Sequence, residues 1–231
     1  MARKIPETRL AELAECATEV FIRRGYRQTQ MADVAEALGV AKGTVYLYVE
    51  SKEALFDLVA RHSIAGRAFE PPSSLPIPTP EPGATVEFAR ASLAAGSALP
   101  RLNEAVAREL VDDPAAELDG IIREIFRTLW RNRVSIKLID RVAAENPELA
   151  DVWFKGGREG LLGLLTAYLA QRIDGGVFRQ PPDVVTAARA IIEMAAFWAV
   201  HRYWDPHPQA IDDSVAEDTV VAFVVRTFVR E

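Results

Sequence analysis

Six of the fourteen residues between Glu70 and Gly83 are proline, and this segment limits what the chain can fold into. Proline removes a main-chain N–H and clashes with the preceding helical turn, so no helix can cross the segment. We expect a semi-rigid, extended connector there. The 231 residues are therefore predicted to form an N-terminal domain (1–62), the end of a fourth helix with the connector (63–83) and a larger domain (84–231).

Apolar residues recur at helical spacing on both sides of this connector, and no run alternates convincingly as a strand would. A first helix is expected from about Glu7 to Arg24, with Gly25 as its C-terminal stop. The β-branched run VVAFVVRTFV near the C-terminus is too long for an ordinary strand, and we interpret it as a buried helix. The sequence thus predicts an all-α protein with a three-helix N-terminal domain and a helical C-terminal domain.

Bulk composition favours a cytoplasmic protein without a membrane span. No apolar run reaches the roughly 18 residues that a span needs. Cys16 is the only cysteine, so an intrachain disulfide is impossible. We therefore expect the protein to be located in a reducing compartment. The net charge of −6 argues mildly against nucleic-acid binding. Residues 1–62 are nevertheless neutral, with nine Lys and Arg against nine Asp and Glu, so the acidic excess lies after them.

Residues 31–49 have the pattern of a helix-turn-helix. Two short helices meet across a tight turn at Gly39, and such a second helix is too short to be stable alone. We expect Val45 and Val49, one turn apart, to anchor it inward. A fourth helix is expected to begin at Ser51, a favourable N-cap. The side chains or positions that should then face outward are Gly43, Thr44, Tyr46 and Leu47.

An outward tyrosine beside an outward leucine is costly in water unless something covers both. DNA would be a suitable cover, because Thr44 can bond base edges or phosphate and Leu47 can touch a thymine methyl. Gly43 would let the backbone approach closely, while Lys42 and Lys52 could neutralise phosphates. Two short helices with a glycine turn also occur in many helical proteins, so the pattern alone leaves a purely structural role open.

The run FIRRGYRQTQMADVAEALGVAKGTVYLYVESKEALFDLV, residues 21–59, closely resembles the N-terminal signature of the TetR family of bacterial repressors. The resemblance implies an all-helical second domain for ligand binding and dimerisation. It also implies that Tyr48 and Lys52 contact phosphates. The full set of DNA contacts that it implies is Gln30, Lys42, Thr44, Tyr46, Tyr48 and Lys52. Ala41 departs from the usual capping Ser, and Val49 departs from the usual Phe.

In the C-terminal domain, the resemblance implies an aromatic-lined cavity for an apolar or aromatic effector. The candidate lining residues are Phe126, Trp130, Trp153 and Tyr168, although the same residues could simply fill the core. Two apolar helix faces could pair with their own copy about a two-fold axis to form a homodimer. The residues of this expected interface are Ile191, Met194, Ala195, Trp198, Val220, Phe223 and Val224.

Together these features predict a transcriptional repressor that a small-molecule effector releases from a palindromic double-stranded DNA operator. A ligand-independent DNA-binding regulator or an activator is the alternative. We do not expect an enzyme, because the sequence has no Ser-His-Asp order, phosphate loop or HExxH. His201, Asp205 and His207 are interrupted by prolines and match no familiar zinc spacing, so neither metal nor cofactor is expected. We expect the ligand signal to pass through the fourth helix rather than through the connector.

Overall fold

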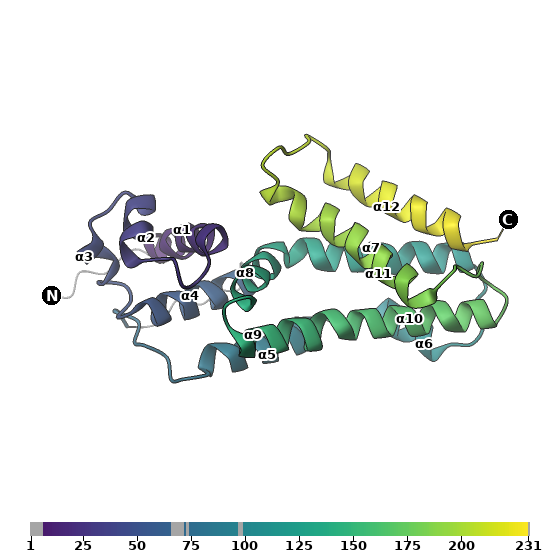
Figure 1. The fold of residues 1–231 in the computed structure, drawn as a ribbon, viewed down its shortest axis with the longest axis horizontal. Helices are drawn as coiled ribbons and strands as arrows, with labels where there is room; N and C mark the ends of the chain where they lie inside the picture. The colour runs from purple at the N-terminus through teal and green to yellow at the C-terminus, as the bar shows by residue number, and fades with distance from the viewer. Residues whose placement is uncertain (1–6, 66–71, 73, 97–98, 231) are drawn as a thin grey trace. The chain divides into compact units, whose positions relative to one another are not determined.

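The structure, a computed structural model, describes residues 7–65, 72, 74–96 and 99–230 (Figure 1). Parts of the predicted N-terminal domain (1–6) and connector (66–71 and 73) lie outside these residues. The regular elements described are all helical, as predicted, and β-pairing is limited to two isolated bridges. Up to the Pro-rich segment the helices are α1 (Glu7–Arg24), α2 (Met31–Leu38), α3 (Lys42–Val45) and α4 (Lys52–Ala65).

After the Pro-rich segment the helices continue to the C-terminus. They are α5 (Ala84–Gly96), α6 (Pro100–Ala107), α7 (Pro114–Arg131), α8 (Arg133–Ala143), α9 (Pro147–Ala150), the π-helical η2 (Asp151–Arg158), α10 (Glu159–Asp174), α11 (Val184–Ala199), the 3-10 helix η3 (His201–Trp204) and α12 (Asp213–Phe228). The β-branched run near the C-terminus is therefore a helix, as the sequence predicts.

The chain separates into two compact units. The first comprises residues 1–93 and 134–153, and the second comprises residues 94–133 and 154–231. In the first unit, α1 packs against α2 and α4. Leu13, Phe21 and Leu55 lie fully buried in the core of this small bundle. A helical period places these residues on the inner faces of α1 and α4, which is why three short amphipathic helices can form a stable unit.

The Pro-rich segment was predicted to connect two domains, but the structure places it within the first unit. Residues 74–83 contain no helix, as expected. They do not separate the two units, however, because both this segment and most of α5 belong to the first unit. The domain boundary expected at 63–83 is corrected by this division. Its physical reason is that the segment hydrogen-bonds to the turn between α3 and α4, which composition alone could not reveal.

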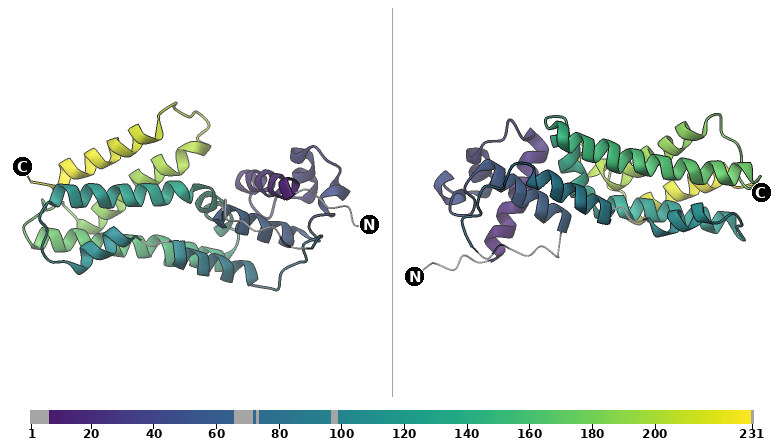
Figure 2. Two further views of the ribbon diagram at one scale, coloured as in Figure 1. Left: turned by 180° about the vertical axis from the view of Figure 1, so that it is seen from behind. Right: turned by 90° about the horizontal axis from the view of Figure 1, so that it is seen from below.

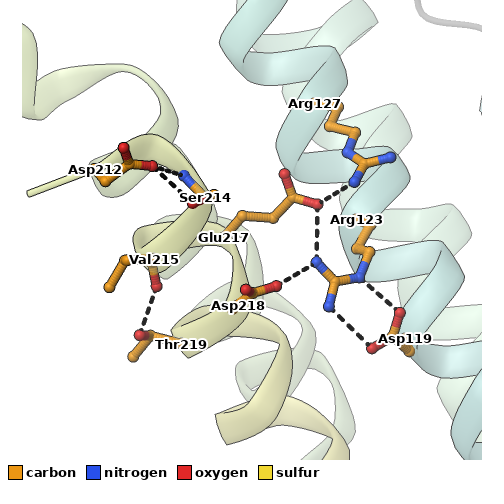
Figure 3. Close-up of polar contacts among 9 residues, drawn as sticks. All are labelled: Asp119, Arg123, Arg127, Asp212, Ser214, Val215, Glu217, Asp218 and Thr219. Atoms are coloured by element: carbon orange, nitrogen blue, oxygen red, sulfur yellow. Dashed lines mark hydrogen bonds and ion pairs between the residues drawn. The ribbon is translucent and has the colours of Figure 1, made fainter.

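The second unit is built on α7, α10, α11 and α12, with α6 against α7 and α10 (Figure 2). Its core is apolar and includes Ile122, Leu165 and Val220. Ion pairs add to this packing between α7 and α12 (Figure 3). Arg123 Nη1 lies 3.1 Å from Glu217 Oε1 and 2.6 Å from Asp218 Oδ1. Hydrogen bonds to Asp119 and Asp218 raise the pKa of Arg123.

Within the described ranges 7–65, 72, 74–96 and 99–230, none of the helices combines the length and the apolar character that crossing a membrane requires.

Candidate nucleic-acid interface

The predicted turn between two short helices is present. Gly39 ends α2 with a φ of 70°, a left-handed conformation that glycine adopts without strain. The N–H of Val40 then donates to the carbonyl of Ala35 over 2.9 Å, which closes the helix end. Ala41 is the N-cap of α3 and provides no side-chain cap, as its identity predicts. α3 is consequently a single turn that depends on packing for its stability.

Packing holds this turn through the two predicted anchors. Val45 and Val49 are both 0% exposed, so the interpretation of their inward orientation is confirmed. On the opposite side, Tyr46 is 41% exposed and Leu47 is 60% exposed. Lys42 and Gly43 are exposed as well, and Thr44 is half-buried. We call the stretch Lys42–Leu47, which contains these exposed positions, the recognition segment.

The surroundings of Gly43 are open. A Cβ built at this glycine meets nothing within 4 Å, so neither neighbouring side chains nor its φ requires glycine there. The absence of a side chain lets an external molecule approach the backbone of α3 closely. This geometry is compatible with the role expected from the sequence.

Gln30 lies at the start of α2 and is exposed. Its main-chain N–H donates to Asp33 Oδ2 over 2.8 Å, and Asp33 in turn lies 2.9 Å from Arg24 Nη1. The cap of α2 is therefore built from Gln30 and Asp33. It leaves the Gln30 side chain at the surface, at the N-terminal end of the helix-turn-helix.

Two of the predicted phosphate contacts, Tyr48 and Lys52, also have contacts within the protein. Tyr48 is 9% exposed, so most of its side chain is buried, in contrast to Leu47. Lys52 is occupied within the protein, since its Nζ donates to the carbonyl of Thr29 over 2.9 Å. It also lies 4.5 Å from the centroid of the Tyr26 ring. These contacts hold the Lys52 side chain against the turn between α1 and α2.

Tyr26 was not identified from the sequence as an important residue, although it stands in the RGY turn. Its hydroxyl donates to Glu53 Oε1 over 3.1 Å. Burial, followed by the charge of Glu53, raises the pKa of Tyr26. A main-chain hydrogen bond, together with the Tyr26 hydroxyl, lowers the pKa of Glu53 despite some burial. Tyr26, Lys52 and Glu53 thus connect the start of α4 with the turn between α1 and α2.

The start of α4 is capped as predicted. The N–H of Ala54 donates to Ser51 Oγ over 3.1 Å, and the N–H of Leu55 donates to the Ser51 carbonyl over 3.0 Å. Ser51 therefore fixes the point at which the chain leaves the recognition segment and enters α4.

The four predicted effector contacts are not brought together. Phe126 and Trp130 both line a cavity of about 750 Å³ in the second unit, between α7 and α12. Tyr168 is fully buried, and its hydroxyl donates to Glu117. Trp153 belongs to the first unit. The cavity is also more polar than expected, being lined by four arginines and four acidic residues: Arg101, Arg123, Arg127, Arg131, Asp119, Glu124, Asp213 and Glu217.

The predicted dimer residues divide into two groups. Four are buried within the single chain, at 4% exposure or less, so their side chains form the protomer core instead of facing a partner; they are Ile191, Ala195, Val220 and Val224. Met194 and Trp198 are half-buried, and Phe223 is 62% exposed. Four of the seven predicted interface residues therefore lie on the inner faces of α11 and α12.

Residues 13–59 match the family model described as "Bacterial regulatory proteins, tetR family". Residues 13–59 therefore form an N-terminal domain of the TetR type. The curated relatives that the TetR domain resembles include the uncharacterized HTH-type transcriptional regulator YfiR of Bacillus subtilis, 46% identical over 50 residues. The HTH-type transcriptional repressor KstR2 of Rhodococcus jostii is 38% identical over 53 residues. These alignments cover 22% and 23% of this chain.

The chain spans about a quarter of the length of these two relatives, 24% and 26%. A solved structure extends the comparison to the whole fold. The ketosteroid transcriptional regulator KstR2 of Mycobacterium tuberculosis superposes with a TM-score of 0.58 at 20% identity, over 100% of both chains. This likeness shows that the helical second domain has a TetR-type fold, while its low identity gives no information about a ligand.

Proposed function

We propose that this protein regulates transcription as a homodimeric DNA-binding repressor that responds to a small molecule. The observation that supports it best is the exposure of Tyr46 and Leu47 on a one-turn helix whose other side is fully buried. Two large side chains that are exposed next to a glycine would be buried when a partner molecule binds this surface. Within a TetR-type helix-turn-helix, the major groove of duplex DNA is the natural cover.

We assign roles in DNA binding by exposure and chemistry. Thr44, Tyr46 and Leu47 would contact base edges, with Leu47 suited to a thymine methyl. Lys42 would bind phosphate and contribute affinity without sequence information. Gly43 would let the backbone approach the groove. Gln30 would contribute from the start of α2. Tyr48 and Lys52 would act indirectly, by shaping the turn on either side of the recognition segment.

The homodimer would use the outward faces of α11 and α12 rather than the inward ones. Phe197 is 43% exposed on α11, and Val215 and Phe223 are 55% and 62% exposed on α12. Met194 and Trp198 lie half-buried beside them. In such a dimer, this surface would pair with the same surface of a second copy about a two-fold axis. The dimer would then present two recognition segments to one palindrome.

The effector would occupy the cavity between α7 and α12 that Phe126 and Trp130 line. A ligand there would meet an aromatic wall together with guanidinium and carboxylate groups. It could weaken DNA binding only by as much as its affinity differs between the DNA-competent and the released conformations.

Selection of bound fragments from random duplex DNA, with the full-length protein, tests the proposal. The expected result is a palindrome whose half-sites are spaced by about 34–36 Å, one helical turn, or a multiple of it. Recovery of no duplex, or of duplexes without two-fold symmetry, would contradict a homodimeric sequence reader. Screening of small molecules for release of the selected duplex then tests the effector separately.

A further inference from the structure

Residues 74–80, which we call the strap, are bound to the turn between α3 and α4. The main-chain N–H of Ile77 donates to the carbonyl of Tyr48 over 2.8 Å, and the N–H of Glu50 donates to the carbonyl of Ile77 over 3.0 Å. These two bonds form an isolated parallel bridge between Val49 and Ile77. Proline-rich segments without partners are extended and solvated, so this pairing is a specific contact and not a property of the composition.

The alternation of prolines matches this contact. Pro76, Pro78 and Pro80 have no N–H to donate, whereas the intervening Ile77 and Thr79 do. In an extended chain, residues two apart direct their N–H groups to the same edge. Both available N–H groups of this stretch are used on the turn, since the N–H of Thr79 donates to the Glu50 carboxylate over 3.1 Å. The prolines occupy the positions where no donor is needed.

A side-chain bond completes the contact. The hydroxyl of Thr79 donates to Ser51 Oγ over 2.7 Å. Ser51 is also the residue that caps α4 through the N–H of Ala54. The strap therefore contacts every residue from Tyr48 to Ser51, which is the stretch that joins the recognition segment to α4.

The other end of the strap continues into α5, and α5 is tied to α4. Thr85 Oγ1 donates to Asp57 Oδ1 over 2.8 Å. Asp57 also binds Arg61 Nε over 2.7 Å, and the Arg61 guanidinium lies 4.4 Å from the centroid of the Phe88 ring. The chain after α4 thus returns along α4 and is fixed both beside that helix and at the turn that precedes it.

We propose that Ile77 and Thr79 are positioning residues for DNA binding, and that the strap holds the turn after α3 in the form that presents Tyr46 and Leu47. α3 is too short to keep its own shape, and Val45 and Val49 fix only its inner side. The strap supplies the restraint at its C-terminal end. Through α5, a shift of α4 would reach this turn, so the proposal gives the connector a part in the coupling that the sequence-based expectation left to the fourth helix. The proposal rests on the proposed function.

Two pairs of variants test it. Ile77→Pro removes the N–H that donates to Tyr48, whereas Ile77→Ala keeps this N–H and shortens the side chain. Thr79→Val removes the hydroxyl bonded to Ser51, whereas Thr79→Ser restores it. Thr18→Val on α1 is a control for the same chemical change elsewhere, because the Thr18 hydroxyl donates to the carbonyl of Ala14 over 2.7 Å.

The first measurement is amide hydrogen exchange at Leu47 and Glu50 in the full chain without DNA. Ile77→Pro is expected to raise exchange at both sites, because the turn loses its partner, while Ile77→Ala leaves exchange near the wild-type level. The second is affinity for the duplex that the wild-type protein selects. Loss of one hydrogen bond at the turn should weaken binding about two- to tenfold in Thr79→Val. Thr79→Ser should recover it, and Thr18→Val should leave it unchanged.

Each outcome decides the proposal. Unchanged exchange at Leu47 and Glu50 in Ile77→Pro would show that the strap does not hold the turn. Raised exchange with wild-type DNA affinity would overturn the positioning role even though the strap is bound. Affinity lost equally in Thr79→Val and Thr79→Ser would also overturn it. If the wild-type protein selected no duplex, the proposed function would fail, and the positioning role in DNA binding would fail with it.

Discussion

The carboxylate of Glu145 accepts a hydrogen bond from the main-chain N–H of Arg27, with 2.7 Å between Oε2 and the nitrogen. The two residues are 118 positions apart in the sequence. Arg141 lies beside them, and its Nη2 donates to the carbonyl of Arg24 over 3.0 Å. The end of α8 therefore closes the turn between α1 and α2, and Gly25 at the centre of that turn is where this contact can be tested.

Gly25→Ala should destabilise the first unit more than Gly39→Ala. Both glycines have a positive φ, 81° and 70°, so alanine is strained by about 1 kcal/mol at either site. A Cβ at Gly25 would also clash with Glu145 Oε1, whereas at Gly39 nothing lies within 4 Å. Glu145 would have to move and lose its bond to Arg27, which costs a further 1–2 kcal/mol or so.

Urea unfolding of the two variants measures this difference. Combining Gly25→Ala with Glu145→Ala should cost less than the sum of the single changes, because both break the same bond. Equal losses for Gly25→Ala and Gly39→Ala would show that the Glu145 contact contributes nothing to stability.

Tyr46→Ala combined with Thr44→Ala should reduce affinity for the selected duplex at least about tenfold, since base contacts contribute roughly 1–3 kcal/mol each. The midpoint of thermal unfolding should hardly change, because Tyr46 is 41% exposed and has no part in the core. Electrophoretic mobility shifts and thermal melts provide the two measurements. Leu110→Ala, at a position that is 88% exposed in the second unit, is the control. A loss of stability that matched the loss of binding would argue that these residues only support the fold.

Phe223→Glu should weaken self-association without unfolding the protomer. The side chain is 62% exposed on α12, so a charge there is solvated in the separate chain but buried if the outward faces of α11 and α12 pair. Sedimentation equilibrium should show a dissociation constant raised about tenfold or more. Leu110→Glu should leave association unchanged. A dimer that tolerated Phe223→Glu would place the interface elsewhere.

The sequence predicted the inward orientation of Val45 and Val49 because one helical turn separates them and the short helix needs anchors. It could not predict that Tyr48 lies inward with Val49. The residues between α3 and α4 follow a turn, where helical spacing no longer assigns faces, and the partners of this turn lie about thirty residues further along the chain.

A related reason explains why four of the predicted dimer residues are buried within the protomer. α11 and α12 are apolar on more than one side: Val220 and Val224 are buried, while Val215 and Phe223 are exposed on the same helix. Periodicity identifies an apolar stripe, but it does not indicate which of two stripes faces the protomer core. The connector is a further example, since proline content predicts the absence of a helix and says nothing about the hydrogen bonds of Ile77 and Thr79.

Glu217→Gln should weaken the packing of α7 against α12. Glu217 is only 9% exposed, and its Oε1 lies 3.1 Å from Arg123 Nη1 and 2.9 Å from Arg127 Nη2 (Figure 3). Removing the charge should cost about 1–2 kcal/mol at low ionic strength and less at high ionic strength, because salt already screens the ion pairs that Glu217 makes in the wild-type protein. Asp218→Asn, on a side chain that is 65% exposed, should cost under about 0.5 kcal/mol. Urea unfolding at two salt concentrations distinguishes the two variants, and equal costs would contradict the importance of burial.

Arg172→Met should be the most destabilising change in the second unit, and Glu117 is the reason. The Arg172 side chain is 1% exposed, and its Nε lies 2.8 Å from Glu117 Oε1, while Nη2 donates to the carbonyl of Ala105 over 2.9 Å. Methionine would leave the carboxylate of Glu117, itself 10% exposed, without its main cation, at a cost of about 3–5 kcal/mol. Adding Glu117→Met should recover part of this loss, because no uncompensated charge then remains buried. A double-mutant cycle by chemical denaturation measures the coupling, and strictly additive losses would show that the buried ion pair does not determine the stability of this unit.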